Sequence, residues 1–131
     1  MKQRNVTLKG FTQRTPTPVG TAFITVSGDR NGPRECFINV GKAGTDIQAD
    51  AEAIGRLISL VLRLPDGLTS EERIKAIIEQ LEDIGGGRQG YEDAKSLPDG
   101  IARTLRGIVW QENDGSATNV EKSVMISVST S

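Results

Sequence analysis

Residues 41–63 read GKAGTDIQADAEAIGRLISLVLR and hold the longest unbroken apolar period in the chain. The apolar residues of this face recur at spacings of four, three, four, three and one, and are Ile47, Ala51, Ile54, Ile58, Val61 and Leu62, with Leu57 alongside. That spacing places them on one wide face of a helix. We therefore predict a largely buried helix over residues 46–63, against which the rest of the domain packs.

Polar and glycine residues in the same stretch predict how this helix begins and packs. Thr45 followed by Gln48 fits a capping box, and Asp46 suits the positive end of the helix dipole. Gly55 falls on the apolar face, although a glycine inside a helix costs about 1 kcal/mol relative to alanine. We predict that another backbone segment approaches the helix closely at Gly55 and compensates for this cost.

An antiparallel hairpin is predicted immediately before the helix. Residues 19–27 alternate between apolar and polar, and residues 34–40 form the return strand. Between them, Asn31-Gly32 is the strongest two-residue hairpin signal that a sequence offers. The side chains expected on the buried face of the first strand are Ala22, Ile24 and Val26.

The two ends of the chain carry weaker patterns. Residues 5–11 alternate briefly and predict a short strand, whereas the prolines in residues 12–18 predict irregular backbone. Near the C-terminus, alternation of apolar residues over 124–128 predicts a last strand. We expect one domain over residues 1–108, with residues 109–131 adding a hairpin or an edge strand to the same domain.

Two further helices are predicted. Thr69 and Glu72 form a capping box for a helix over residues 70–83, and Ser96 opens a third helix over residues 97–107. The inner face of the 70–83 helix is predicted to consist of Ile74, Ile77, Ile78 and Leu81. The inner face of the third helix is predicted to consist of Ile101, Leu105 and Ile108. The predicted fold class is α+β, with an antiparallel sheet packed against these helices.

Composition excludes several classes of function. The net charge of −1 gives no general polyanion-binding surface, and an aromatic content of 4% argues against a base-stacking platform, so no nucleic-acid partner is expected. No apolar run approaches the roughly 18 residues of a membrane span. The 131 residues include no histidine, which removes the commonest general base. With a single cysteine no internal disulfide can form, and a soluble cytoplasmic protein is expected.

Two glycine-rich segments are candidates for anion binding. Gly41, Lys42, Gly44 and Thr45 place amides and a lysine at the start of the predicted helix, where anions are commonly held. Arg88 lies in a second glycine-rich segment and could likewise contact a phosphate. Both segments also fit purely structural roles, the first as a tight turn and the second as a helix stop and linker.

Neither the acids nor the cysteine of this chain predict a reactive centre. The cluster of Asp46, Asp50 and Glu52 fits a solvated helix start, so no metal site is predicted. Cys36 lies in the middle of a predicted strand, where a buried and inert thiol is expected.

Three runs of the sequence resemble a known family. They are LKGFTQRTPTPVGTAFITV at residues 8–26, CFINVGKAGTDIQADAEAIGRLISLVLRL at 36–64 and SLPDGIARTL at 96–105. In this order they resemble the TSCPD-type C-terminal domain of adenosylcobalamin-dependent (class II) ribonucleotide reductases. The resemblance implies a link to the reduction of ribonucleotides to deoxyribonucleotides. It implies adenosylcobalamin for the related holoenzyme and no cofactor for this chain.

The chain departs from the family at two positions. Many relatives carry cysteines where this sequence has Val19 and Leu97, and the resemblance implies that these positions lie close together. Any metal or redox role of those thiols is absent here. Thiyl chemistry with a reducing cysteine pair needs at least three cysteines, so we expect that this chain alone does not reduce ribonucleotides.

Two functional classes stay open. The chain is either an accessory domain that docks onto the catalytic barrel or another subunit of a reductase, or an independent binding or homo-oligomerising module. The second class could use the turn at Gly41–Thr45 for an anion or a nucleotide. We expect either a stand-alone relative or a domain of a larger reductase.

Overall fold

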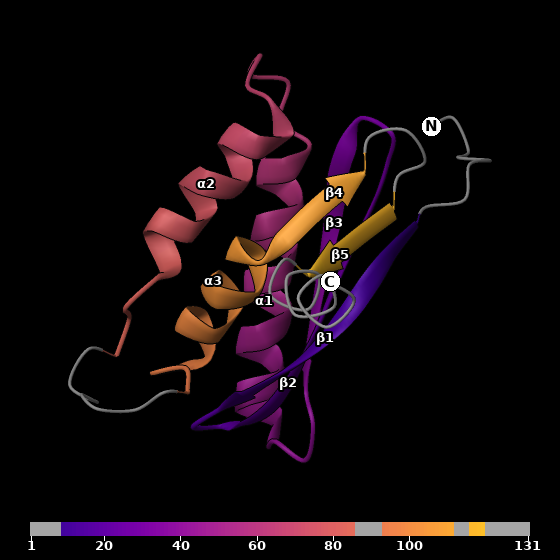
Figure 1. Cartoon of the computed structure of the whole chain (residues 1–131). Coiled ribbons are helices and arrows are strands. Elements are labelled where there is room, and N and C mark those ends of the chain that lie inside the picture. Colours follow the sequence, from indigo (N-terminus) through magenta and orange to yellow (C-terminus); the bar gives the residue numbers. More distant parts are fainter. Residues whose placement is uncertain (1–8, 86–92, 112–115, 120–131) are drawn as a thin grey trace.

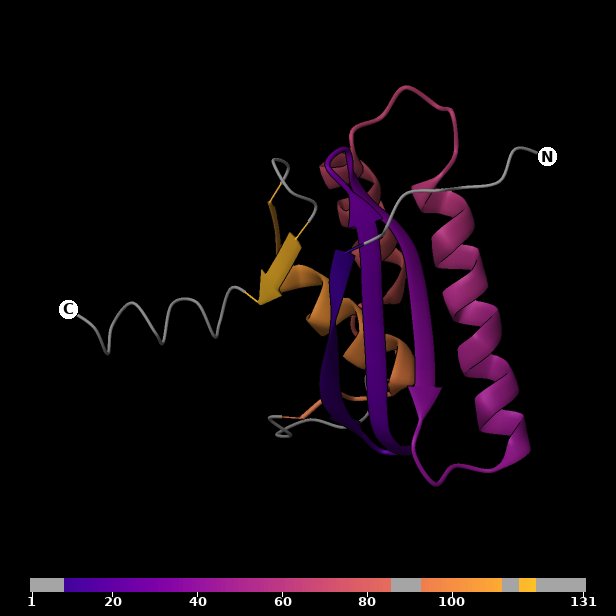
Figure 2. The same cartoon turned by 90° about the vertical axis from the view of Figure 1, so that its right-hand side faces the viewer.

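The computed structural model describes residues 9–85, 93–111 and 116–119. Three antiparallel strands form a sheet in the order β1-β2-β3; α2 and α3 lie on one face of it, and α1 runs along the edge formed by β3 (Figures 1 and 2). A separate two-stranded sheet joins β4 to β5. The predicted α+β class is confirmed. In chain order, the elements are β1 (Lys9–Thr17), β2 (Gly20–Asp29), β3 (Gly32–Val40), α1 (Thr45–Leu62), α2 (Ser70–Leu81), α3 (Leu97–Arg106), β4 (Ile108–Gln111) and β5 (Ser116–Asn119).

The predicted hairpin is confirmed as β2 and β3. Every second residue of β2 faces the helices, and the predicted set Ala22, Ile24 and Val26 is completely buried. The turn consists of Arg30 and Asn31, one residue earlier than Asn31-Gly32 suggests. Gly32 opens β3 with a φ of 118°, a left-handed conformation that favours glycine.

The prediction of irregular backbone over residues 12–18 was wrong. Strand β1 runs through this segment and pairs with β2, with Pro16 opposite Thr21. Strand β1 pairs with another strand of this sheet on one side only. A proline in it therefore interrupts at most one ladder of backbone hydrogen bonds. Of the strand predicted over residues 5–11, positions 5–8 lie outside the described residues.

Helix α1 begins one residue earlier than predicted, and its capping box was wrong. The N-cap is Gly44, without a side-chain hydrogen bond. The Gln48 side chain instead contacts β3, where its oxygen accepts from the Val40 amide at 3.2 Å and its nitrogen donates to the Val40 carbonyl. The amide and carbonyl of Val40 point outward from the edge of β3 and do not pair with a neighbouring strand. Gln48 binds these groups instead of capping the helix.

Further along α1, Ser59 and Gly55 continue the contact with the β3 edge. The Ser59 hydroxyl accepts from the Cys36 amide at 2.9 Å and donates to the Cys36 carbonyl at 3.1 Å. A Cβ on Gly55 would lie 3.0 Å from the Cys36 carbonyl oxygen. The predicted close approach at Gly55 is therefore confirmed. We call Gln48, Gly55 and Ser59 the edge-sealing stripe.

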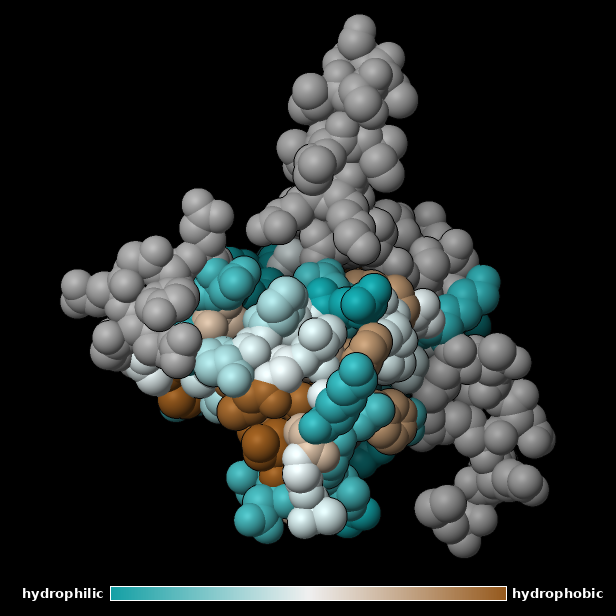
Figure 3. Space-filling model, turned by 90° about the horizontal axis from the view of Figure 1, so that it is seen from below, coloured by the Kyte–Doolittle hydropathy of each residue, from teal (hydrophilic) through white to brown (hydrophobic). Residues whose placement is uncertain are grey.

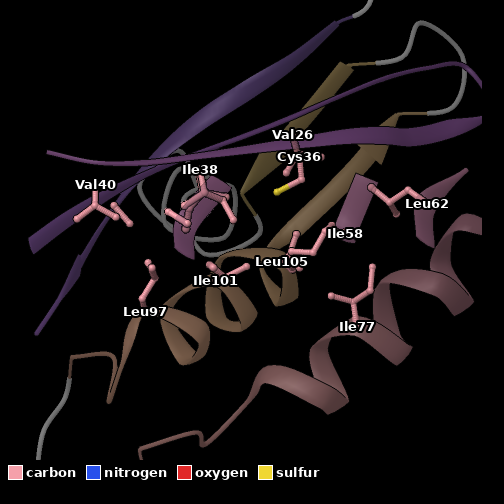
Figure 4. Packing of buried hydrophobic residues seen from close by; sticks show 13 residues of the cluster. Val26, Cys36, Ile38, Val40, Ile58, Leu62, Ile77, Leu97, Ile101 and Leu105 are labelled. Carbon is pink, nitrogen blue, oxygen red and sulfur yellow. The ribbon is translucent and has the colours of Figure 1, made fainter. Parts of the chain in front are cut away.

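The other two helices complete one core. The capping box of Thr69 and Glu72 is confirmed at the start of α2, and Ser96 caps α3 by accepting from the Asp99 amide. Figure 4 shows apolar side chains from the sheet and from all three helices directed into a shared interior. A buried hydrogen bond of 2.7 Å between Thr15 and Thr104 joins β1 to α3.

After α3 the chain forms the β4–β5 hairpin. The Trp110 indole donates to the Asp29 carbonyl at 2.9 Å and ties β4 to the end of β2. Ile108, expected on the inner face of the third helix, instead begins β4, while still packing against the core. The strand predicted over 124–128 lies outside the described residues, and the domain division at residue 108 stays a prediction. No helix among the described residues is long and apolar enough to cross a membrane.

The close contact at Gly55 yields a stability prediction. Gly55→Ala gains up to about 1 kcal/mol in helix propensity, but its Cβ must push α1 away from the β3 backbone. We expect a net loss of about 1–2 kcal/mol, as for other overpacked sites, measured by urea unfolding. Gly44→Ala is the control, because no atom lies within 4 Å of a Cβ there and its loss should stay below about 1 kcal/mol. A net stabilisation by Gly55→Ala would contradict the close packing.

Candidate functional site

An apolar pocket of about 510 Å³ lies at the end of the molecule where α1 begins. Figure 3 views the protein from this end and shows apolar side chains gathered into one patch. The β1–β2 turn, the first half of α1 and the start of α3 form its walls. We call it the end pocket, and its lining residues are Pro18, Val19, Ile47, Asp50, Ala53, Ile54, Lys95, Ser96, Leu97 and Pro98.

The structure brings Val19 and Leu97 to this same pocket, although they are far apart in sequence. Leu97 is buried, whereas Val19 sits in the β1–β2 turn with 40% of its surface exposed. Leu97 therefore belongs to the core, and Val19 stays accessible at the rim.

Asp99 organises the segment that carries Leu97, a role that the sequence analysis missed. Its carboxylate accepts from the amides of Asp83 and Lys95, both at 2.9 Å, and pairs with Arg103 at 3.2 Å. Burial raises the pKa of Asp99. The hydrogen bonds from the two amides and the charges of Arg103 and Lys95 together lower this pKa by more than burial raises it, so the net shift is downward. The ionised carboxylate thus joins the end of α2 to the start of α3.

The turn at Gly41–Thr45 has fewer free amides than its glycines suggest. The Gly41 amide donates to the Thr21 carbonyl at 2.9 Å, and the Ala43 amide donates to the Val40 carbonyl at 3.3 Å. Lys42, Gly44 and Thr45 are exposed. Lys42 adopts a φ of 61°, so the turn is tight. Arg88 lies outside the described residues. Anion binding at this turn stays a prediction.

Cys36 is positioned as an inert thiol. Its side chain is almost completely buried between the sheet and α1, and this burial raises its pKa to about 12. A thiol with such a pKa is protonated at neutral pH and is a poor nucleophile. Within the described ranges, no group of three or more histidine, cysteine, aspartate or glutamate side chains is placed to hold a metal ion.

The lowered pKa of Asp99 predicts a pH-dependent stability. Because the folded-state pKa lies below the ordinary value of 3.8, ionised Asp99 stabilises the fold above that value. This contribution is lost as the pH falls through the folded-state pKa. Asp99→Asn should cost about 1–3 kcal/mol at neutral pH, since it leaves buried donors poorly paired. Denaturant unfolding should show the difference from the parent protein shrinking below pH 3.8; a difference independent of pH would contradict the role of the charge.

The shared pocket of Val19 and Leu97 yields a cross-linking prediction. A chain carrying Val19→Cys and Leu97→Cys should form an intramolecular disulfide on oxidation, which requires Cα atoms within about 7 Å. Mass spectrometry of the oxidised protein measures this directly. Leu97→Cys with Val109→Cys is the control, because Val109 is also exposed but lies in β4. Equal reaction of both pairs, or of neither, would contradict the proximity.

Comparison with known proteins places the chain in a family. Part of it is similar to DCC-interacting protein 13-beta of Rattus norvegicus, with 31% identity over 98 residues, 72% of this chain and 14% of that protein. This match spans too little of the rat protein to carry a functional inference. No solved structure matches the chain. The sequence model of the TSCPD domain family matches residues 1–108 of this chain. The chain therefore belongs to the TSCPD domain family, whose domain is found in class II ribonucleotide reductases.

Proposed function

We propose that this chain is a non-catalytic accessory domain that acts by docking onto the catalytic barrel or another subunit of an adenosylcobalamin-dependent ribonucleotide reductase. The observation that carries the proposal is the TSCPD match over residues 1–108, which links the chain to these reductases. In this proposal adenosylcobalamin and the reacting cysteines belong to the catalytic partner, and the complex operates in the cytoplasm during synthesis of DNA precursors.

The chemistry of Cys36 supports a role without catalysis. Ribonucleotide reduction through a thiyl radical and a reducing pair requires several accessible cysteines. This chain has one cysteine, and that thiol is buried beneath α1 with its backbone held by Ser59. The chain can therefore contribute binding and positioning to such a reaction, but not the sulfur chemistry.

The end pocket is the surface that we assign to docking. It is apolar, it lies at an accessible end of the molecule, and the exposed Val19 stands at its rim. Ser96 and Asp99 hold the α3 side of the pocket in a fixed geometry through hydrogen bonds, so that its shape is formed before a partner arrives. A preformed apolar surface loses little conformational freedom on binding.

The test uses this chain and the catalytic subunit of the adenosylcobalamin-dependent reductase from the same organism. We expect calorimetry to detect binding, and Val19→Glu to weaken it at least tenfold without changing the thermal unfolding midpoint, because a charge would enter an apolar contact. Phe37→Glu is the control, since Phe37 is 60% exposed in β3 and does not line the end pocket. Absence of binding by the parent chain would contradict the proposal, and equal effects of both variants would contradict the assigned surface.

A further inference from the structure

The charged residues that line the end pocket are Asp50 from α1 and Lys95 from the segment before α3. The chain itself neutralises Lys95. Its ammonium pairs with the Asp83 carboxylate at 3.0 Å, and only 24% of its side chain is exposed. Its backbone amide also donates to the Asp99 carboxylate at 2.9 Å. The cation of the pocket is therefore already compensated before any partner binds.

Asp50 differs from Lys95 in this respect. It is exposed, and in the ranges that the structure describes no cation pairs with its carboxylate. Asp46 lies one turn earlier in α1, and like charges four residues apart destabilise a helix slightly. The helix dipole favours Asp46 in the first turn, but its influence falls off before the second turn, where Asp50 lies. Neither ion pairing nor the helix dipole therefore explains a carboxylate at position 50.

The surface beside Asp50 is apolar. Ile47 and Ile54 from α1 face Leu97 from α3 across the pocket, and Val19 stands at its rim. The volume of about 510 Å³ falls in the range of about 300–1,000 Å³ that is usual for ligand pockets. Figure 3 shows hydrophilic side chains at the border of the apolar patch. An apolar centre with polar groups around it is the common arrangement of a protein interface.

We propose that the end pocket accepts a segment of the catalytic subunit in which an apolar side chain adjoins a lysine or an arginine, with the apolar side chain in the pocket and the cation at Asp50. This inference rests on the proposed function and adds the chemistry of the docking segment. A basic residue gains a new ion pair at Asp50. An acidic residue would have to displace Asp83 from Lys95 while meeting the uncompensated charge of Asp50.

The two contacts of the docking segment affect different rate constants. Asp50 is exposed, and charges at the rim of an interface act mainly on the association rate and its dependence on salt. Apolar contacts inside an interface act mainly on the dissociation rate. We therefore expect Asp50 to influence how fast the chain associates with the catalytic subunit, and Val19 to influence how long the complex lasts.

Surface plasmon resonance with the immobilised catalytic subunit from the same organism tests the role of Asp50. Asp50→Lys should lower the association rate constant about 3- to 10-fold at low salt, and less at high salt, because the cation of the partner is repelled. Glu79→Lys is the matched control. It makes the same change of charge at an exposed carboxylate of α2 that does not line the end pocket, and should leave the rate nearly unchanged.

The outcomes separate this inference from the proposed function. A parent chain that does not bind would overturn docking itself, and the inference with it. A parent chain that binds, with Asp50→Lys associating as fast as Glu79→Lys or faster, would overturn the basic residue and leave docking intact. Circular dichroism should show the same fold in both variants, since both positions are exposed.

The sign of the partner's charge can also be tested at Val19. Val19→Glu and Val19→Lys both place a charge in the apolar contact and should both weaken binding. A basic docking segment repels only the lysine, so the dissociation constant of Val19→Lys should exceed that of Val19→Glu at least about threefold at low salt. Without a basic partner the order would reverse, because the long lysine stem carries its charge to solvent more easily. Equal or reversed dissociation constants would therefore overturn the proposal.

Discussion

The structure depends on the way α1 satisfies the backbone of the β3 edge. Strand β3 borders the sheet, and the amides and carbonyls of Cys36 and Val40 point away from β2. In the edge-sealing stripe, Ser59 and Gln48 each provide both a donor and an acceptor to one of these residues. Gly55, between them, lets the helix come close enough for both contacts. An open edge would otherwise be a template for pairing with other chains.

The position of α1 along the β3 edge determines which of its side chains face outward. With its inner side against β3 and the core, the first half of α1 forms a wall of the end pocket, and the second half exposes Leu57 and Leu60. The two surfaces therefore depend on a single helix but involve different residues.

Local patterns predicted those features whose cause is local. The capping box at Thr69 and the hairpin from β2 to β3 depend on neighbouring residues, and the spacing around Gly55 already implied a close backbone. The role of Gln48 could not be predicted from the sequence. Its side chain binds the Val40 backbone instead of the helix end, and Val40 comes within reach only once the sheet has formed. Pro16 within β1 is tolerated because of the edge position of that strand, which the sequence does not reveal. Asp99 was missed because one of its partners, Asp83, lies 16 residues earlier in the turn after α2.

Native-state amide hydrogen exchange tests the sealing of the β3 edge most directly. The Cys36 and Val40 amides lie on an edge strand, where unpaired amides exchange rapidly with solvent. If Ser59 and Gln48 bind them as described, both amides should be protected nearly as well as the central strand β2 and exchange only through global unfolding. Exchange of the Cys36 and Val40 amides at the rate of exposed edge amides, with β2 still protected, would contradict this account of the fold.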